Sequence, residues 1–128
     1  MVEDNHADVV LMQEALAEYA VEYSLRVLSD GAETVSFLHS VNLKNRSACP
    51  DVVLLDLNLP KVDGHELLRL IREHPVCSEV PVIIVTSSDS AEDRQRAAQL
   101  GATDYFRKPS SLEDFLKLGG IVKKVAAA

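Results

Sequence analysis

The chain has 128 residues, of which 47% are apolar and 26% are charged, a composition typical of one globular domain with a buried core. Its net charge of −7 argues against a nucleic-acid-binding surface, and no apolar run is long enough for a membrane span. The sequence starts with acidic residues rather than a signal peptide, which indicates a cytoplasmic location. Cys49 and Cys77 lack the spacing of a zinc site or a disulfide framework, so we expect two small, partly buried residues.

Helical periodicity and short apolar runs alternate along the chain. In chain order they predict a helix at 7–19, a strand at 23–28, a helix at 32–40, a strand at 52–56, a helix at 65–74, a strand at 82–86, a helix at 90–100, a strand at 104–107 and a helix from 111 onward. Ser90 and Ser111 each precede an acid by three residues, which is typical of a helix start, and Gly101 suits a helix end. Gly119 and Gly120 are expected to kink, fray or shorten the last helix.

Strands that alternate with helices predict a three-layer, doubly wound α/β fold, with a parallel sheet between two layers of helices. The sheet has five strands if Met1 and Val2 are the end of a first one. That strand is nearly absent, so we expect the true start of the domain to lie upstream of Met1. Residues 1–128 are otherwise predicted to form a single domain.

Polar side chains follow the apolar strands at the point where each strand ends. Glu3 and Asp4 follow the first strand, Asp56 the central one, Thr86 completes the next, and Lys108 follows the last. Because the carboxyl ends of parallel strands meet at one edge of a sheet, these groups are expected to lie close together. The alternatives are an exposed acidic turn at positions 3 and 4 and a surface lysine at position 108.

The chemistry of these groups indicates phosphoryl transfer to an aspartate. Three carboxylates at one edge repel each other without a cation, and clustered oxygen ligands suit Mg²⁺ or Mn²⁺. Lys108 supplies a positive charge for an anion, and Thr86 supplies a hydroxyl. A nucleophilic carboxylate, a divalent metal, a lysine and a hydroxyl together describe such a site.

The constellation resembles the receiver domain of the response regulators of bacterial two-component systems, over essentially the whole chain. The matching motifs are Val2-Glu3-Asp4-Asn5, Leu54-Leu55-Asp56-Leu57-Asn58-Leu59-Pro60, Asp63-Gly64, Thr86-Ser87, Gly101-Ala102 and Lys108-Pro109. The resemblance implies a flavodoxin-like sheet with strand order 2-1-3-4-5. The loop before Pro50 and the segment 56–61 also resemble the single-domain regulators that partner bacterial phytochromes.

The resemblance implies that Asp56 is the phosphoacceptor and a metal ligand. It assigns Asp4 as a direct ligand of Mg²⁺ or Mn²⁺, Glu3 as a ligand acting through water, and Asn58 as a ligand through its backbone carbonyl. The implied role is a phosphorylation-dependent signalling switch. The phosphoryl donor is a sensor histidine kinase, with a histidine phosphotransfer protein as a further partner. Nucleic acid and membrane are not expected partners, and no oligomer is implied.

The resemblance also implies the switching residues. Lys108 matches the lysine that holds a phosphoryl oxygen, and the bond before Pro109 is expected to be cis. Thr86 matches the hydroxyl that moves to the phosphate, although either of the two serines that follow it could substitute. Tyr105 matches the aromatic residue that then moves inward, although a tyrosine on a short strand is often simply half-buried.

Two other functions are compatible with parts of the pattern. A pseudo-receiver would bind partners without phosphoryl chemistry, which the full set of site residues argues against. A metal-dependent phosphatase with an aspartyl-phosphate intermediate would carry its nucleophile on the first strand, with a second aspartate where Asn58 stands. Beyond Mg²⁺-dependent self-phosphorylation on Asp56 and the slow loss of that phosphoryl group, the chain is therefore not expected to be an enzyme. The histidines are expected to be solvated helix or loop residues: His6, His39, His65 and His74.

Overall fold

The computed structural model describes residues 1–127, so Ala128 of the expected domain lies outside the described residues. The helices lie close to their predicted positions. They are α1 (His6–Glu18), α2 (Gly31–Ser40), α3 (Gly64–Glu73), α4 (Ala91–Gln99) and α5 (Leu112–Ala127), with a short 3-10 helix η1 (Arg46–Ala48). Ser90 accepts a hydrogen bond from the Asp93 N–H at the start of α4, and Gly101, just after α4, has φ of 92°, as the helix signals predict.

The regular sheet is parallel and has three strands in the order β1-β2-β3. These strands are β1 (Val53–Leu55), β2 (Val82–Thr86) and β3 (Asp104–Arg107). β1 and β2 are buried along their whole length, as expected of central strands with helices on both faces. The predicted strand at 23–28 is not a regular strand in the structure.

Single bridges continue the sheet beyond β1. Val2 forms one parallel bridge with Leu28 and another with Leu55, so it lies between these two residues. The Val2 N–H donates to the Leu54 carbonyl at 2.7 Å, and the Glu3 N–H donates to the Leu28 carbonyl at 3.0 Å. Met1 also pairs with segment 23–28: its amino group donates to the Arg26 carbonyl at 2.8 Å, and the Leu28 N–H donates to the Met1 carbonyl at 2.9 Å. Together these contacts form one bridge, at Leu28, and not a regular strand.

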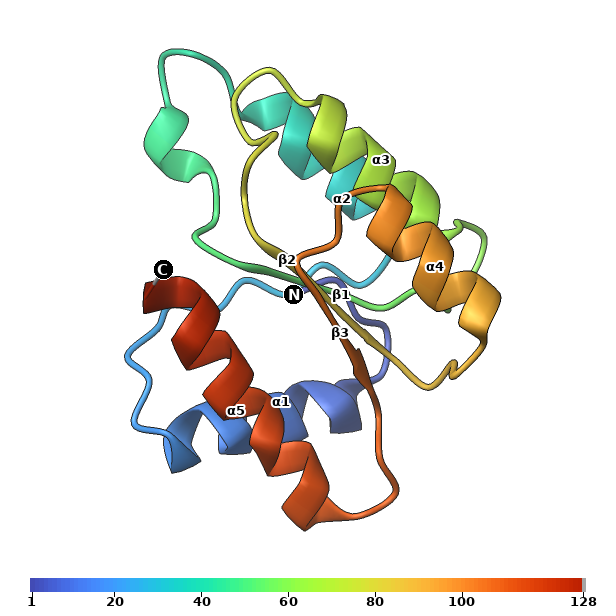
Figure 1. Ribbon diagram of the computed structural model, residues 1–128. Helices are drawn as coiled ribbons and strands as arrows, with labels where there is room; N and C mark the ends of the chain where they lie inside the picture. The colour runs from blue at the N-terminus through green and yellow to red at the C-terminus, as the bar shows by residue number, and fades with distance from the viewer. Residues whose placement is uncertain (128) are drawn as a thin grey trace.

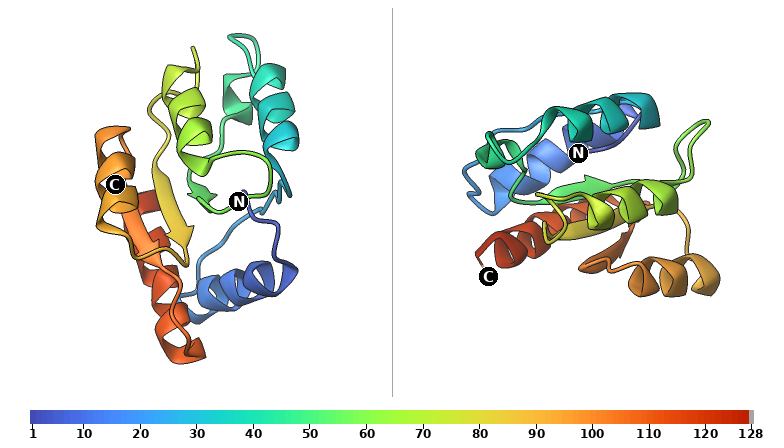
Figure 2. Two further views of the ribbon diagram at one scale, coloured as in Figure 1. Left: turned by 90° about the vertical axis from the view of Figure 1, so that its right-hand side faces the viewer. Right: turned by 90° about the horizontal axis from the view of Figure 1, so that it is seen from above.

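The sheet separates two layers of helices (Figures 1 and 2). Leu55 and Ile84 face α2, α3 and α4, whereas Leu54 and Ile83 face α1 and α5. Each face buries its own apolar cluster, as the alternation of side chains along a strand requires. The fold is thus the expected three-layer α/β arrangement.

The two glycines of α5 do not break the helix, which runs on to Ala127. A Cβ atom on Gly119 would lie 2.0 Å from the Ala15 carbonyl oxygen of α1, and one on Gly120 would lie 2.9 Å from the ring of Tyr19. The expected shortening of the helix is therefore wrong. The absence of side chains lets α1 and α5 pack closely, and this packing offsets the low helix propensity of glycine.

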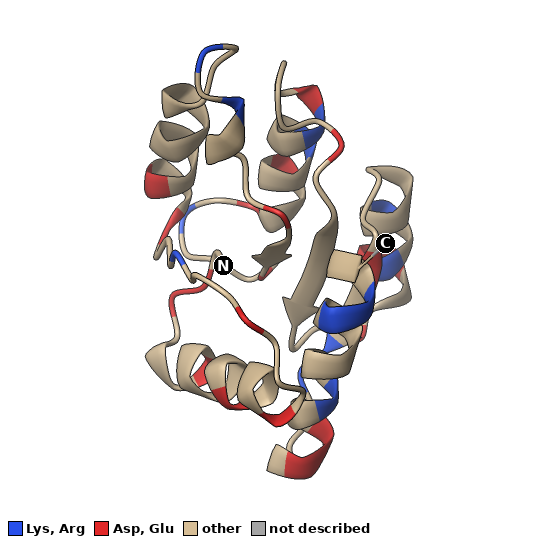
Figure 3. Ribbon diagram, turned by 90° about the vertical axis from the view of Figure 1, so that its left-hand side faces the viewer, with Lys and Arg blue, Asp and Glu red and all other residues tan. Residues whose placement is uncertain are grey.

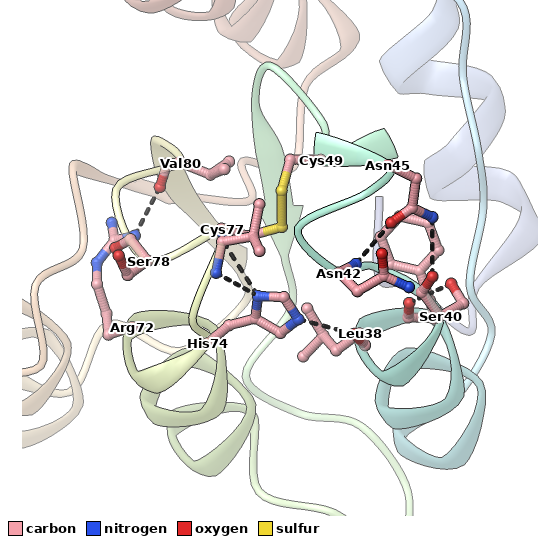
Figure 4. Close-up of a disulfide and its surroundings, with 12 residues drawn as sticks. Leu38, Ser40, Asn42, Asn45, Cys49, Arg72, His74, Cys77, Ser78 and Val80 are labelled. Carbon is pink, nitrogen blue, oxygen red and sulfur yellow. Dashed lines mark hydrogen bonds between the residues drawn. A yellow bond between two sulfur atoms is a disulfide. The ribbon is translucent and has the colours of Figure 1, made fainter. Parts of the chain in front are cut away.

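The expectation for the cysteines is also wrong, because Cys49 and Cys77 form a disulfide across 28 positions of sequence (Figure 4). Both precede a strand by a few residues, so the loop after α2 and the loop after α3 meet at the amino end of the sheet. This proximity brings the Cα atoms to 5.7 Å, within the range that a disulfide requires. Sequence spacing carries no information about it.

Hydrogen bonds to backbone groups surround the disulfide (Figure 4). His74 donates from Nε2 to the Leu38 carbonyl at 2.7 Å, and its Nδ1 accepts from the Cys77 N–H at 3.1 Å. Arg72 donates to the carbonyls of Ser78 and Val80. His74 is thus a structural residue rather than a solvated one. Among residues 1–127, no helix is both long enough and apolar enough to cross a membrane.

Candidate functional site

Backbone pairing brings the predicted site residues to one edge of the sheet. The Asp56 N–H donates to the Val2 carbonyl at 3.1 Å, which places Asp56 beside Glu3 and Asp4. The Lys108 N–H donates to the Thr86 carbonyl at 2.7 Å, directly after β3. The peptide bond before Pro109 is trans, since the described residues contain no cis peptide bond. The cis bond implied by the resemblance is therefore wrong, and trans is the isomer that most bonds before proline adopt.

Lys108 is the centre of the charged cluster. Its Nζ lies 2.8 Å from Glu3 Oε2, 2.8 Å from Asp8 Oδ2 and 2.9 Å from Asp56 Oδ2. Burial alone would lower the pKa of Lys108, but its hydrogen bonds to Asp8, Glu3 and Asp56 outweigh burial and raise it. Lys108 is therefore a permanent cation, and it is not the surface lysine of the alternative interpretation.

The two buried carboxyl groups differ in their affinity for a proton. Burial and the charge of Asp56 raise the pKa of Glu3 to about 7, although Lys108 opposes this rise. Burial also acts to raise the pKa of Asp56, but the hydrogen bonds from the Asn58 N–H at 2.9 Å and from Lys108 lower it overall. Asp56 therefore stays an anion, as a nucleophilic carboxylate must.

Glu3, Asp4 and Asp56 each offer a carboxylate oxygen within 4.8 Å of the other two. Glu3 and Asp56 are buried, whereas Asp4 is exposed, so the group is open to solvent on one side. One lysine cannot neutralise these acids together with Asp8, and a set of hard oxygen donors suits Mg²⁺ or Mn²⁺. The residues present therefore fit a divalent metal.

This region is acidic because residues 1–25 contain no lysine or arginine, and the first basic residue of these two types is Arg26. Acidic positions recur along α1 and the segment before it, whereas lysines lie along the neighbouring α5 (Figure 3). Within the cluster of acids, positive charge comes from Lys108, more than one hundred positions away from Glu3. A divalent cation would complement this charge distribution.

Thr86, at the end of β2, is fully buried, and its hydroxyl accepts a hydrogen bond from the Asn58 amide at 3.0 Å. The Ser88 N–H also points to Thr86 Oγ1, at 3.4 Å. Tyr105 is half-buried, and its hydroxyl donates to the Ser88 carbonyl at 2.9 Å. The guanidinium of Arg94 lies 4.4 Å from the centre of the Tyr105 ring. The hydroxyl and the aromatic ring are thus joined through Ser88.

Two residues at this end of the sheet were not predicted. Asp8, in the first turn of α1, belongs to the charged cluster, and the only signal for it was an acid at the start of a helix that follows Asp4. His65 is buried rather than solvated, with an exposed fraction of 3%. Its partners come from a loop and from α4, which no local pattern indicated. His6 and His39 are exposed, as expected.

The chain belongs to the response regulator receiver domain family, which matches residues 1–118. The response regulator Rcp1 of Synechocystis sp. is 36% identical over 118 residues, which cover 92% of this chain and 80% of Rcp1. The structure of the phosphorylated cyanobacterial phytochrome response regulator RcpA is similar with a TM-score of 0.85, at 32% identity, over 99% of this chain and 91% of RcpA. The manganese-bound form of Rcp1 is similar with a TM-score of 0.81, at 36% identity, over 94% of this chain and 87% of that structure. The expected likeness to regulators that partner phytochromes is thus confirmed.

Proposed function

We propose that this receiver domain accepts a phosphoryl group on Asp56 from a histidine of a sensor histidine kinase. The observation that carries the proposal is the contact of a buried, anionic Asp56 with Lys108, beside Glu3 and Asp4. A carboxylate oxygen of Asp56 forms a bond to phosphorus while the bond between phosphorus and the kinase imidazole nitrogen breaks. The electron pair of the broken bond stays on that nitrogen. Acetyl phosphate is a small-molecule alternative donor.

Asp4, Asp56 and the Asn58 backbone carbonyl would hold Mg²⁺ or Mn²⁺, with Glu3 acting through water. A bound divalent metal supplies positive charge for the phosphoryl oxygens. Lys108 contributes a second, fixed positive charge on the Asp56 side of the site. The structure of a manganese-bound Rcp1 supports this assignment by similarity.

Phosphorylation acts as a switch through Thr86 and Tyr105. An aspartyl phosphate brings new acceptor oxygens close to the Thr86 hydroxyl, which can form a hydrogen bond to one of them. When the Thr86 hydroxyl moves toward the phosphate, its contact with Ser88 changes, and Ser88 in turn contacts Tyr105. The surface formed by α4, β3 and α5 then changes shape, and a partner that prefers one shape detects the phosphorylated state.

The likeness to Rcp1 and RcpA makes a histidine kinase of the phytochrome type the first donor to test, with a histidine phosphotransfer protein as a second. Such a relay would operate in the cytoplasm, without a nucleic-acid or membrane partner. The strand order 2-1-3-4-5 also belongs to this proposal. The two bridges of Val2, to Leu28 and to Leu55, support its first part.

Intact-mass spectrometry after incubation with acetyl phosphate tests the proposal. We expect one base-labile phosphoryl adduct that requires Mg²⁺ and that the Asp56→Asn variant does not form. Asp51→Asn is the matched control, because Asp51 is an exposed aspartate just before β1, at the opposite end of the sheet. Absence of the adduct in the folded wild-type protein would refute the proposal and indicate a pseudo-receiver.

A further inference from the structure

His65 lies at the start of α3 and faces acceptor groups on two sides. Its Nδ1 is 3.0 Å from Asp63 Oδ1, and its Nε2 is 3.1 Å from the backbone carbonyl oxygen of Asp93 in α4. A carbonyl oxygen only accepts hydrogen bonds, so the His65 Nε2–H donates to the Asp93 carbonyl. Arg96 also binds Asp63, at 3.1 Å from its Oδ2.

The side chain of Asp93 continues this network toward the predicted switch residues. Its Oδ2 accepts a hydrogen bond from the Ser88 hydroxyl at 2.6 Å. Ser88 in turn contacts Thr86 through its N–H and Tyr105 through its carbonyl oxygen. A continuous set of contacts thus leads from α3, through the first turns of α4, to Thr86.

Helix α4 has little apolar packing of its own, because Ala97 is the one residue of Ala91–Gln99 that is buried. A helix with so small a buried surface gains little stability from the hydrophobic effect. Its polar contacts therefore decide where it lies relative to α3. The contact between His65 and Asp93 is made by a buried side chain, whereas the Arg96 side chain is 53% exposed. Hydrogen bonds shielded from water contribute more to stability than exposed ion pairs do.

We propose that His65 is a positioning residue that holds α4 against α3, so that a movement of Thr86 and Ser88 is transmitted to α4 as a whole. This inference rests on the proposed function, since it concerns how far the structural change caused by phosphorylation of Asp56 extends. Without the His65 contact, Ser88 and the first turn of α4 rearrange locally. The rest of the α4 surface, which a partner would contact, then stays unchanged.

Backbone amide NMR with Mg²⁺ and beryllium fluoride, a phosphoryl mimic, tests this inference in the intact chain. In wild type we expect shifts of the amides of Thr86, Ser88 and residues 91–99. In His65→Leu the shifts of residues 94–99 fall at least threefold, while those of Thr86 and Ser88 persist. His65→Gln restores the α4 response, because a glutamine amide can still donate to the Asp93 carbonyl. Arg69→Ala is the control, since Arg69 lies on α3 and its side-chain partners among residues 1–127 are Glu66 and Glu73.

The possible outcomes separate the two hypotheses. An unchanged α4 response in His65→Leu would overturn the positioning role while leaving the proposed function intact. Equal loss in the Leu and Gln variants would also overturn it, because it would show a general packing effect. Absence of any response to the mimic in the wild-type protein would refute the proposed function, and the role of His65 with it. If His65→Leu does not fold, His65→Met replaces it, because methionine also lacks a donor to the Asp93 carbonyl, and we expect the same selective loss in α4.

Discussion

The two ends of the sheet are held together by different physical means. At the carboxyl end, three acids contact one lysine and a fourth, Asp4, lies beside two of them, so that like charges are within a few ångströms of one another. At the amino end, a disulfide joins two loops, and Arg72 and His74 bind backbone carbonyls (Figure 4). The carboxyl end is thus poised to bind a cation and an additional anion, whereas the amino end has its bonds already satisfied. The two ends should therefore respond to different changes.

The largest expected effect comes from removing the charge at the centre of the carboxyl end. Lys108→Ala leaves buried Glu3 and Asp56 without their cation, which should reduce the free energy of unfolding by ~3–5 kcal/mol near neutral pH. Because a divalent metal would replace the lost charge, Mg²⁺ should restore more stability to this variant than to wild type. Denaturant unfolding with and without Mg²⁺ measures both effects. Lys117→Ala, at an exposed ion pair of α5, should change little, and an equal effect in the two variants would contradict the comparison.

The disulfide should give the next largest effect. Replacing both Cys49 and Cys77 by alanine removes a constraint on a loop of 28 positions, for which chain entropy predicts a loss of roughly 3–4 kcal/mol. Phosphoryl uptake by Asp56 should persist at a temperature where the variant is folded, because the disulfide lies at the other end of the sheet. Thermal unfolding and intact-mass measurements check the two statements. A dithiol reductant should destabilise wild type but not the double variant. Loss of uptake in the folded variant would show that the two ends are coupled.

Arg72 should give a smaller loss of stability at the same end. Arg72→Met keeps most of the apolar stem but removes the donors to Ser78, Val80 and Gly101, and unpaired carbonyls cost about 1–3 kcal/mol. Denaturant unfolding with Arg69→Met as the control measures this effect, since Arg69 is a half-exposed arginine of the same helix. Equal stability of the two variants would show that water replaces the Arg72 contacts without cost.

The smallest expected effect is a pH dependence at Asp63. Burial acts to raise its pKa, but the hydrogen bonds from the His65 N–H and ring and the charge of Arg96 lower it overall. Since the folded state binds this proton more weakly than the unfolded state does, Asp63 stabilises the fold above its ordinary pKa. That contribution is lost as the pH falls through the lowered value. Unfolding curves of wild type and Asp63→Asn should therefore converge in acid, and a constant difference at all pH values would contradict this.

The local parts of the structure could be predicted because short-range physics determines them. β-branched apolar runs form β1 and β2, and the serine at position 90 caps α4. Alternation of strands and helices then predicts a parallel sheet, which brings Asp56, Thr86 and Lys108 to one edge. The charged edge follows from this order of elements, whereas the family resemblance rests on the motifs at the strand ends. The irregular segment 23–28 shows the limit of prediction from local patterns, since a regular strand forms only where it has a partner strand.

Other features depended on which elements pack together, and local sequence patterns do not indicate this packing. The disulfide, the contact of Asp8 with Lys108 and the bond from His65 to Asp93 each join segments far apart in the sequence. Gly119 shows the same principle, because its helix is stabilised by close contact with α1 rather than by its own propensity. The sequence by itself determined the elements and the residues at their ends. The tertiary structure decided their partners, because contacts between distant segments depend on how whole helices and strands pack.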